Sequence, residues 1–213
     1  MNTEESTKNT KEKILEVANE LFAKNGYGAT SIRDIATAAD VNLAAINYHF
    51  NNKENLYWKV FDFNYDWIKQ EIEKLGKKNI TTPELAVEVF RFFVSSGSAI
   101  MNTFKIFLSD NIGIPEVELQ IDQEERFGPP GQQVFLEKIQ NDLGKELSPE
   151  GQRWAMKMIF SLLVHIGVMM NTAMMKSRCQ KEPDMSQDNL EKSVYHSAQA
   201  HLDYLKANHH LWK

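Results

Sequence analysis

The sequence contains a single cysteine, Cys179, among 213 residues, so an internal disulfide is excluded. It has only 6 prolines and 10 glycines, which rules out collagen-like and low-complexity chains. The first residues, MNTEESTKNTKEK, hold no apolar run of the secretory type. The hydrophobic fraction, 42%, is enough to bury a core in one large domain or two small ones. We therefore expect a globular cytoplasmic protein.

Signatures of common catalytic and metal sites are also missing. The lone cysteine has no CxxC partner, and neither a glycine-rich phosphate loop nor a Ser/His/Asp arrangement stands out. His196 and His201 are five residues apart, not the four that place two ligands on one helix face. We expect no enzyme activity, no metal and no cofactor.

The chain lacks an excess of basic residues. It has 24 basic and 29 acidic side chains, for a net charge of −5, and residues 1–60 alone hold seven basic and eight acidic ones. Affinity for DNA comes largely from lysine and arginine that neutralise phosphates. This charge argues at first sight against a nucleic-acid partner, unless neutral groups hold the backbone.

One apolar stretch approaches membrane-spanning length. Residues from Met158 to Met175 carry no charge, and about 18 apolar residues suffice to span a bilayer. The stretch also contains Ser161, His165 and Asn171, which are costly in lipid. We interpret it as a buried helix of a soluble protein rather than a membrane span.

Apolar spacing predicts helices throughout and no sheet. Thr10 is expected to cap a first helix that Asn25-Gly26 ends, and Thr30 and Ser31 to cap a second. Further helices are predicted at Leu43–Phe50 after the Asn42 cap, at about Lys53–Leu75, from Pro83 toward Met101, around Phe104–Leu108, and at Gln132–Leu143, Pro149–Arg178 and Asp188–Ala207, with an irregular stretch from Asn111 to Gly131. The fold class is all-α. We expect two domains, 1–52 and 53–213, joined by the helix that begins at Lys53.

Residues 31–50 have the spacing of a helix-turn-helix, whose second helix enters the DNA major groove. Leu43, Ile46 and Phe50 share one face and are expected to pack inward. The opposite face then combines small and hydrogen-bonding side chains, as reading a groove requires: Ala44, Ala45, Asn47, Tyr48 and His49. From spacing alone, an amphipathic surface of a small bundle is an equal alternative.

The ordered segments Gly26–Ser31, Ile35-Ala36, Ala39–Asn42, Ile46–Phe50 and Lys53–Leu56 closely resemble the N-terminal domain of the TetR family of bacterial transcriptional regulators. The resemblance covers about residues 10–60. It implies a homodimeric, all-helical DNA-binding protein, usually a repressor, that leaves a palindromic operator when a small molecule enters the C-terminal body.

Site residues follow from this resemblance by position. It implies phosphate contacts for Thr30, Ser31 and Arg33, base contacts for Asn42, Ala44, Ala45 and Asn47, and backbone contacts beside the groove for Tyr48, His49 and Lys53. Two residues depart from the family pattern. Asp40 stands where glycine is usual, at a turn position that often needs positive φ, and Asn47 replaces the commoner tyrosine.

The sparse basic charge fits this role if helix starts hold phosphates. Free N–H groups at the starts near Ser31 and Asn42 carry partial positive charge, with Arg33 and Lys53 as the nearest full charges. We accordingly predict weak nonspecific affinity and a shallow salt dependence.

The C-terminal body has to be interpreted from its own residues. Nine methionines, which adapt to irregular apolar shapes, suggest a pocket for a small apolar or aromatic effector. Ordinary core packing remains the alternative for each residue, including His165. The candidate effector-binding residues are Phe93, Met101, Phe104, Trp154, Met158, Leu162, His165 and Met169.

The last two helices are expected to form the dimer interface. The Pro149–Arg178 segment is apolar on several faces, as expected for packing within and between subunits. The last helix would contribute Leu190, Val194, Ala198, His201, Leu202 and Leu205. The predicted function is a sequence-specific, ligand-released dimeric repressor; the alternative is a helical small-molecule carrier or enzyme with an inactive DNA-binding head.

Overall fold

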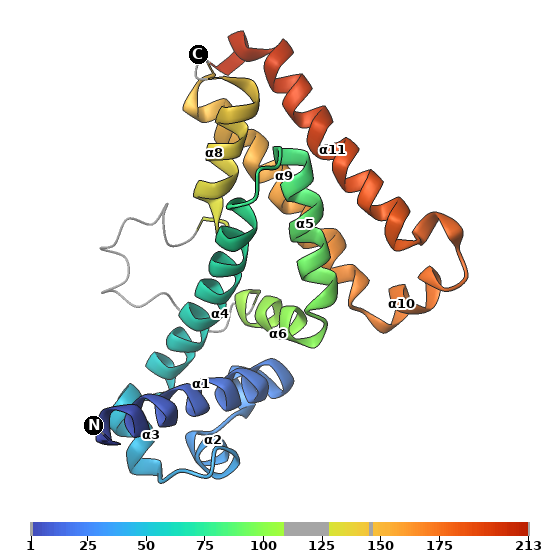
Figure 1. Cartoon of the computed structure of the whole chain (residues 1–213). Helices are drawn as coiled ribbons and strands as arrows, with labels where there is room; N and C mark the ends of the chain where they lie inside the picture. The colour runs from blue at the N-terminus through green and yellow to red at the C-terminus, as the bar shows by residue number, and fades with distance from the viewer. Residues whose placement is uncertain (1, 109–127, 145–146, 213) are drawn as a thin grey trace. The chain divides into compact units, whose positions relative to one another are not determined.

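The computed structural model of the chain describes residues 2–108, 128–144 and 147–212, with side chains from Thr10 onward, and its regular elements within these ranges are all helices (Figure 1). These described residues divide into two compact units. The N-terminal unit holds residues up to Trp67 together with Met101–Leu108, and the C-terminal unit holds Ile68–Ile100 and the described residues from 128 onward. The N-terminal unit thus extends beyond the expected boundary at residue 52.

The first three helices lie where the sequence predicts them, but the first begins earlier than expected. Helix α1 spans Asn2–Ala29, so Thr10, expected to cap it, lies inside the helix, because the residues before Thr10 also adopt helical geometry. Gly26, at φ 80°, breaks this geometry where the Asn25-Gly26 stop was expected. Helices α2 (Ile32–Ala38) and α3 (Leu43–Phe50) follow, with Asp40 between them at φ 50°. The positive φ expected at Asp40 is confirmed.

The core of the N-terminal unit joins these helices to parts of α4 and α6. Helix α4 spans Lys53–Gly76 and α6 spans Ser98–Phe107. The buried side chains of this core include Ile14, Ala18, Phe22, Ile35, Ile46, Phe50, Leu56, Val60 and Ile106. Burial of each large apolar side chain stabilises the unit by about 1.5–3 kcal/mol.

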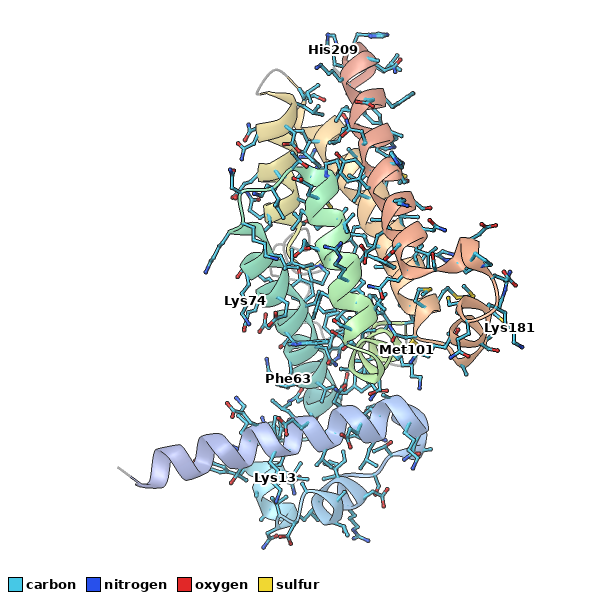
Figure 2. All side chains as sticks on the ribbon, turned by 45° about the vertical axis from the view of Figure 1, so that its right-hand side comes forward. Lys13, Phe63, Lys74, Met101, Lys181 and His209 are labelled. Carbon is cyan, nitrogen blue, oxygen red and sulfur yellow. The ribbon has the colours of Figure 1, made fainter. Side chains whose placement is uncertain are left out.

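Helix α4 is shared by the two units. Phe63 and Lys74, labelled in Figure 2, stand on this one helix but belong to different units. Met101, also labelled on α6, begins the part of α6 that belongs to the N-terminal unit. The Tyr57 hydroxyl on α4 donates a buried hydrogen bond to the Ile106 carbonyl on α6 at 3.1 Å. Sequence spacing did not predict this attachment of α6.

The C-terminal unit packs long helices around an aromatic and aliphatic core. Helices α5 (Thr82–Ser95), α9 (Pro149–Met170) and α11 (Gln187–Ala207) contact one another, and α8 (Gln132–Leu143) packs on α5, α9 and α11 (Figure 1). The shorter α10 (Ala173–Cys179), η2 (Pro183–Met185) and η3 (His209–Trp212) complete it. The core side chains include Phe90, Phe93, Phe135, Ile139, Ile159, Leu163, Val194 and Leu202.

Gly167 allows α9 to approach α5 closely. A Cβ atom at this position would lie 2.8 Å from the Cβ of Phe93, which is fully buried. Such a contact is closer than packed carbon atoms tolerate, since their optimum is about 3.5–4.0 Å. The absence of a side chain at Gly167 therefore sets the α5–α9 spacing.

Two predicted helices are shorter than expected. The Pro149–Arg178 segment is two helices, because Asn171 ends α9 and the Thr172 hydroxyl accepts the Met175 backbone N–H that begins α10. The helix predicted toward Met101 ends at Ser95, since Gly97 adopts φ 54°. Most of the irregular stretch predicted from Asn111 to Gly131 lies outside the described residues.

Helix α9 is long and apolar enough to cross a membrane by length and composition alone, a test that core helices of soluble proteins also pass. Its side chains Met156, Ile159 and Leu163 are buried within the C-terminal unit, where α9 packs on α5, α8 and α11.

Candidate nucleic-acid interface

Helix α3 has one buried and one exposed face. Ile46 (0% exposed) and Phe50 (2%) fix it to the N-terminal core. Asn42 caps its start, and its Oδ1 accepts the backbone N–H of Ala44 at 2.9 Å. The exposed side holds Ala44, Asn47 and Tyr48, and Tyr48 is 80% exposed. Because its inward anchors are rigid, this helix can present the outward face as a fixed surface.

Leu43 departs from the expected pattern. The sequence placed it with Ile46 and Phe50 on the inward face, but 36% of its surface is exposed. Leu43 is the first residue of α3, and the residues one helical turn later, Ile46 and Asn47, lie on different faces. Helical periodicity alone could not decide on which side a residue at the edge of the apolar stripe would fall.

The start of α2 already holds an internal anion. Ser31 and Asp34 form a capping box: the Ser31 backbone N–H and hydroxyl both donate to Asp34 Oδ2, at 2.9 and 2.7 Å, and the Ser31 oxygen accepts the Asp34 N–H. These bonds, first from the side chain and then from the backbone of Ser31, lower the pKa of the Asp34 carboxyl. A negative Asp34 opposes phosphate binding here, so the expected role of this helix start is weakened. Arg33 next to it is exposed.

Thr30 does not lie on the exposed surface. It is 1% exposed, and its hydroxyl is directed to the backbone carbonyls of Leu21 (3.2 Å) and Gly26 (2.9 Å). These contacts hold the segment between α1 and α2. The structure gives the Thr30 side chain an internal role in place of the phosphate contact expected from the resemblance.

Aromatic contacts support the far end of α3 and the start of α4. The rings of Tyr48 and His49 meet edge to face at 5.1 Å between centroids. Lys53 Nζ lies 4.2 Å from the ring centroid of Tyr27, a cation–π distance that places the ammonium beside α1. Burial, and then the charge of Glu54, raise the pKa of the Tyr27 hydroxyl. Lys53 is therefore held in place before any ligand binds.

The eight candidate effector residues are divided between the two units. Phe93 is fully buried in the C-terminal core, while Met101 and Phe104 belong to the N-terminal unit. The other five form a single outward stripe along α9, where each is half-buried or exposed: Trp154, Met158, Leu162, His165 and Met169. Spacing correctly placed these five on one face of the helix, and among the described residues that face is directed away from the core of the C-terminal unit.

The outward surface of the last helix also differs from the dimer surface that the sequence predicted. Val194, Ala198, Leu202 and Leu205 are buried inside the C-terminal unit against α5 and α9. The outward side of α11 carries Ala200 and Tyr204 instead. An apolar stripe indicates which residues share a face, and here it faces the chain's own core.

The described residues of the C-terminal unit line surface hollows of two kinds. The first, about 400 Å³, is lined by Trp154, Ala200, His201, Tyr204 and Trp212, with Trp154 and Trp212 5.1 Å apart between ring centroids. The second, about 420 Å³, is lined by Lys78, Ile80, Glu84, Val87, Glu88, Arg91 and Tyr195. In the second, Arg91 bridges Glu88 and Glu191, both at 2.6 Å, and so ties α5 to α11. Lys78 also pairs with Glu88.

Within the described ranges, no group of three or more His, Cys, Asp or Glu side chains is placed to hold a metal ion.

Residues 14–59 match the profile described as bacterial regulatory proteins of the tetR family. This range contains the core of α1, all of α2 and α3, and the start of α4. Residues 14–59 therefore form a DNA-binding domain of the TetR type.

Curated proteins with similar TetR-type domains are transcriptional regulators. The chain is 39% identical over 70 residues to the regulator QacR of Staphylococcus aureus, covering 30% of this chain and 37% of QacR. It is 40% identical over 73 residues to the probable regulator YttP of Bacillus subtilis, covering 34% and 35%. The similarity thus spans about a third of the length of these curated relatives.

Solved structures of TetR-type regulators share the fold over nearly the whole chain. FadR of Bacillus subtilis, solved in complex with stearoyl-CoA, superposes with a TM-score of 0.62 at 22% identity, covering 88% of this chain and 96% of that one. NalD of Pseudomonas aeruginosa, a repressor of a multidrug efflux pump, gives 0.59 at 22% identity, covering 91% and 97%. At this identity the likeness establishes the all-α TetR fold.

Proposed function

We propose that the protein is a dimeric, sequence-specific DNA-binding regulator in the cytoplasm, acting as a repressor that a small apolar or aromatic molecule releases from its operator. The observation that carries this proposal is the TetR-type helix-turn-helix, whose α3 presents an exposed face of Ala44, Asn47 and Tyr48. The curated relatives with the same domain are regulators, and IcaR of Staphylococcus epidermidis is named a negative one. We infer that the chain acts by binding rather than by catalysis.

Residues on the exposed side of this domain contact DNA in the proposal. Ala44, Ala45 and Asn47 face the major groove, while Ser31, Arg33, Asn42, Tyr48, His49 and Lys53 flank it. Tyr48 supports this assignment because an 80% exposed tyrosine on a short helix has a free hydroxyl for a phosphate. Thr30 supports the fold of the domain from inside.

The DNA-binding proposal is tested with the full chain and duplex DNA from upstream of its own gene. Tyr48→Ala combined with His49→Ala should abolish the protected footprint, whereas Tyr195→Ala, an exposed tyrosine on α11, should leave it intact. A footprint over a short palindrome supports a specific regulator. Equal binding by all three proteins, or no protection by the parent, would favour a carrier with an inactive head.

The outward stripe of α9 supports a dimer interface. Trp154, Met158, Leu162, His165 and Met169 form a largely apolar line that the chain itself leaves half-covered or open, next to the outward Ala200 and Tyr204 of α11. Contiguous exposed apolar surface on a soluble protein commonly marks an interaction site. The stripe fits a second copy of the chain, placed through α9 and α11.

Sedimentation tests the interface with two matched substitutions. Met158→Glu places a charge in the stripe, and Met174→Glu places one on α10, where the parent methionine is also exposed, at 60%. Met158→Glu should yield monomers and weaken binding to a palindromic site, while Met174→Glu should sediment as the parent does. A dimer that survives Met158→Glu places the interface elsewhere.

We also propose that a bound effector releases the protein from its operator. FadR was solved with stearoyl-CoA, and SmeT with triclosan, which supports an apolar ligand for a chain of this fold. Stearoyl-CoA and triclosan serve as probes. When each is titrated into the protein–DNA complex, at least one of them should release the protein from the DNA. Tight binding of a probe without change in DNA affinity would overturn the switching step and leave DNA binding standing.

A further inference from the structure

The exposed face of α3 carries an apolar side chain that the helix-turn-helix pattern did not assign. Leu43, Ala44, Asn47 and Tyr48 follow the spacing of a single helical face, and Leu43 is 36% exposed. An exposed leucine alone means little, because such residues are common on protein surfaces. Here it lies one turn before Asn47 on α3, the helix that enters the groove in the proposed function.

The two asparagines of this region are not chemically equivalent. Asn42 Oδ1 accepts the Ala44 backbone N–H, which holds this side chain in the helix cap and leaves its Nδ2 donors free. In the described part of the chain, the Asn47 side chain makes no hydrogen bond, and it keeps both a donor and an acceptor. A bidentate contact to adenine needs both, one for N7 and one for the N6 amino group.

Leucine and alanine offer only apolar contacts, and the apolar group that the major groove presents is the thymine methyl. Leu43 and Asn47 are four residues apart, which is a rise of about 6 Å along the helix. Base pairs are stacked about 3.4 Å apart. The two side chains therefore reach base pairs no more than about two steps apart.

We infer that α3 reads A·T pairs: Asn47 binds an adenine edge, and Leu43 with Ala44 contacts the methyl of a thymine within two steps of it. Asn42, with its oxygen engaged in the cap, donates to a phosphate instead of reading a base. This inference rests on the proposed function and names the bases that its central surface recognises.

The experiment begins with the purified full chain, which selects binding sites from random duplex DNA. In the selected half-site, single adenines are replaced by 7-deazaadenine, which lacks the N7 acceptor, and single thymines by uracil, which lacks only the methyl. The parent protein should lose affinity at one adenine, and replacement of that A·T pair by G·C should cost about tenfold or more. Uracil at a thymine within two steps should weaken binding about fourfold, the value expected for one buried methyl at about 0.8 kcal/mol.

Substitutions in the protein assign each contact. Asn47→Ala should remove the sensitivity to 7-deazaadenine, and Leu43→Ala the sensitivity to uracil. Asn79→Ala and Leu211→Ala change exposed residues of the same types in the C-terminal unit and should keep both sensitivities. The base replacements act on the DNA alone, so the test holds even if a variant folds poorly.

The outcomes separate the two levels of the proposal. If the parent enriches no sequence, the proposed function falls and this inference falls with it. If a specific site is selected but is insensitive to both base replacements, or if Asn47→Ala and Leu43→Ala retain the parent's sensitivities, the assignment of bases is overturned and the proposed function stands.

Discussion

The Thr103 hydroxyl on α6 donates a hydrogen bond to Oδ1 of Asn64 on α4 at 3.0 Å, and both residues are almost completely buried. Asn64 in turn donates from Nδ2 to Oδ1 of Asn19 on α1, at 2.9 Å. Three helices of the N-terminal unit are thus joined through one polar network inside an apolar core. Buried networks of this kind fix a unique packing, because any partner that shifts leaves another without a bond.

Removal of one member should show this dependence. Thr103→Val keeps the side-chain volume but leaves Asn64 Oδ1 buried without a donor, so we expect a loss of about 1–3 kcal/mol of unfolding free energy. Adding Asn64→Leu removes the orphaned oxygen, and the double variant should be less unstable than the sum of the two single variants. Denaturant titration of the four proteins measures this coupling. If the two losses of unfolding free energy simply add, the hydrogen bond between Thr103 and Asn64 does not contribute to stability.

Asn42 has two roles, capping α3 and the proposed contact to DNA, and two substitutions can distinguish them. Asn42→Ala removes the acceptor for the Ala44 N–H and should cost about 1 kcal/mol. Asn42→Ser keeps a capping oxygen and should retain nearly full stability, while losing the amide donors proposed to contact a phosphate. Urea unfolding together with DNA titration distinguishes these effects. Equal stability of the two variants would contradict the capping role.

The capping box of α2 predicts a pH dependence. Hydrogen bonds from Ser31 lower the folded-state pKa of Asp34 below its unfolded value of about 3.9. The stabilisation is therefore complete above that value and is lost as the pH falls through the folded-state pKa. Asp34→Asn should be less stable than the parent at neutral pH, and the difference should shrink on acidification. The comparison uses thermal melts across pH 2–7, roughly the range in which carboxyls titrate; a constant difference would rule out the carboxylate as its source.

Two glycines should respond in opposite ways to alanine. In Gly167→Ala the new methyl would lie 2.8 Å from Phe93 Cβ and Cδ2, so overpacking of about 1–3 kcal/mol should exceed the helix-propensity gain of about 1 kcal/mol. Gly28 has no atom within 4 Å of the corresponding position and no positive φ. Gly28→Ala should therefore stabilise the protein. Chemical denaturation of both variants gives the signs, and stabilisation in both would show that α5 can move away from α9.

Salt titration tests how the backbone of DNA is held. Arg33 is exposed and Lys53 is half-buried over Tyr27, so each subunit has two basic side chains among the expected contacts. At about 0.9 per neutralised phosphate, the slope of log affinity against log salt should be no steeper than about −4 for a dimer. A much steeper slope would indicate that lysines of α1 also bind phosphates.

Local signals in the sequence predicted several helix bounds well. The bounds of α3 and α8 and the stop at Gly26 follow from caps and breakers, which act over a few residues. The positive φ of Asp40 was expected from the family resemblance, and the start of α1 before Thr10 was missed. The break between α9 and α10 was hidden, because Asn171 and Thr172 lie in a long uncharged run. It depends on tertiary contacts: the Asn171 amide donates to the carbonyls of Phe93 on α5 and Gly167 on α9.

The candidate site was predictable where the surface is local and not where it depends on distant neighbours. The family resemblance located α3, but the burial of Thr30 and the exposure of Leu43 depend on how α1, α2 and α3 pack. Likewise, spacing placed Trp154 and Met169 on one face of α9, but it could not tell whether that face meets a ligand, the core or another subunit.

The division into two compact units also determines how these stabilities have to be measured. Trp58 and Trp67 lie in the N-terminal unit, and Trp154 and Trp212 lie in the C-terminal one. A chain of two cooperative units does not have a single free energy of unfolding when one unit melts before the other. Fluorescence from variants that keep only Trp58 or only Trp154 would follow each transition separately. The effect of Thr103→Val is then read from the first reporter and that of Gly167→Ala from the second.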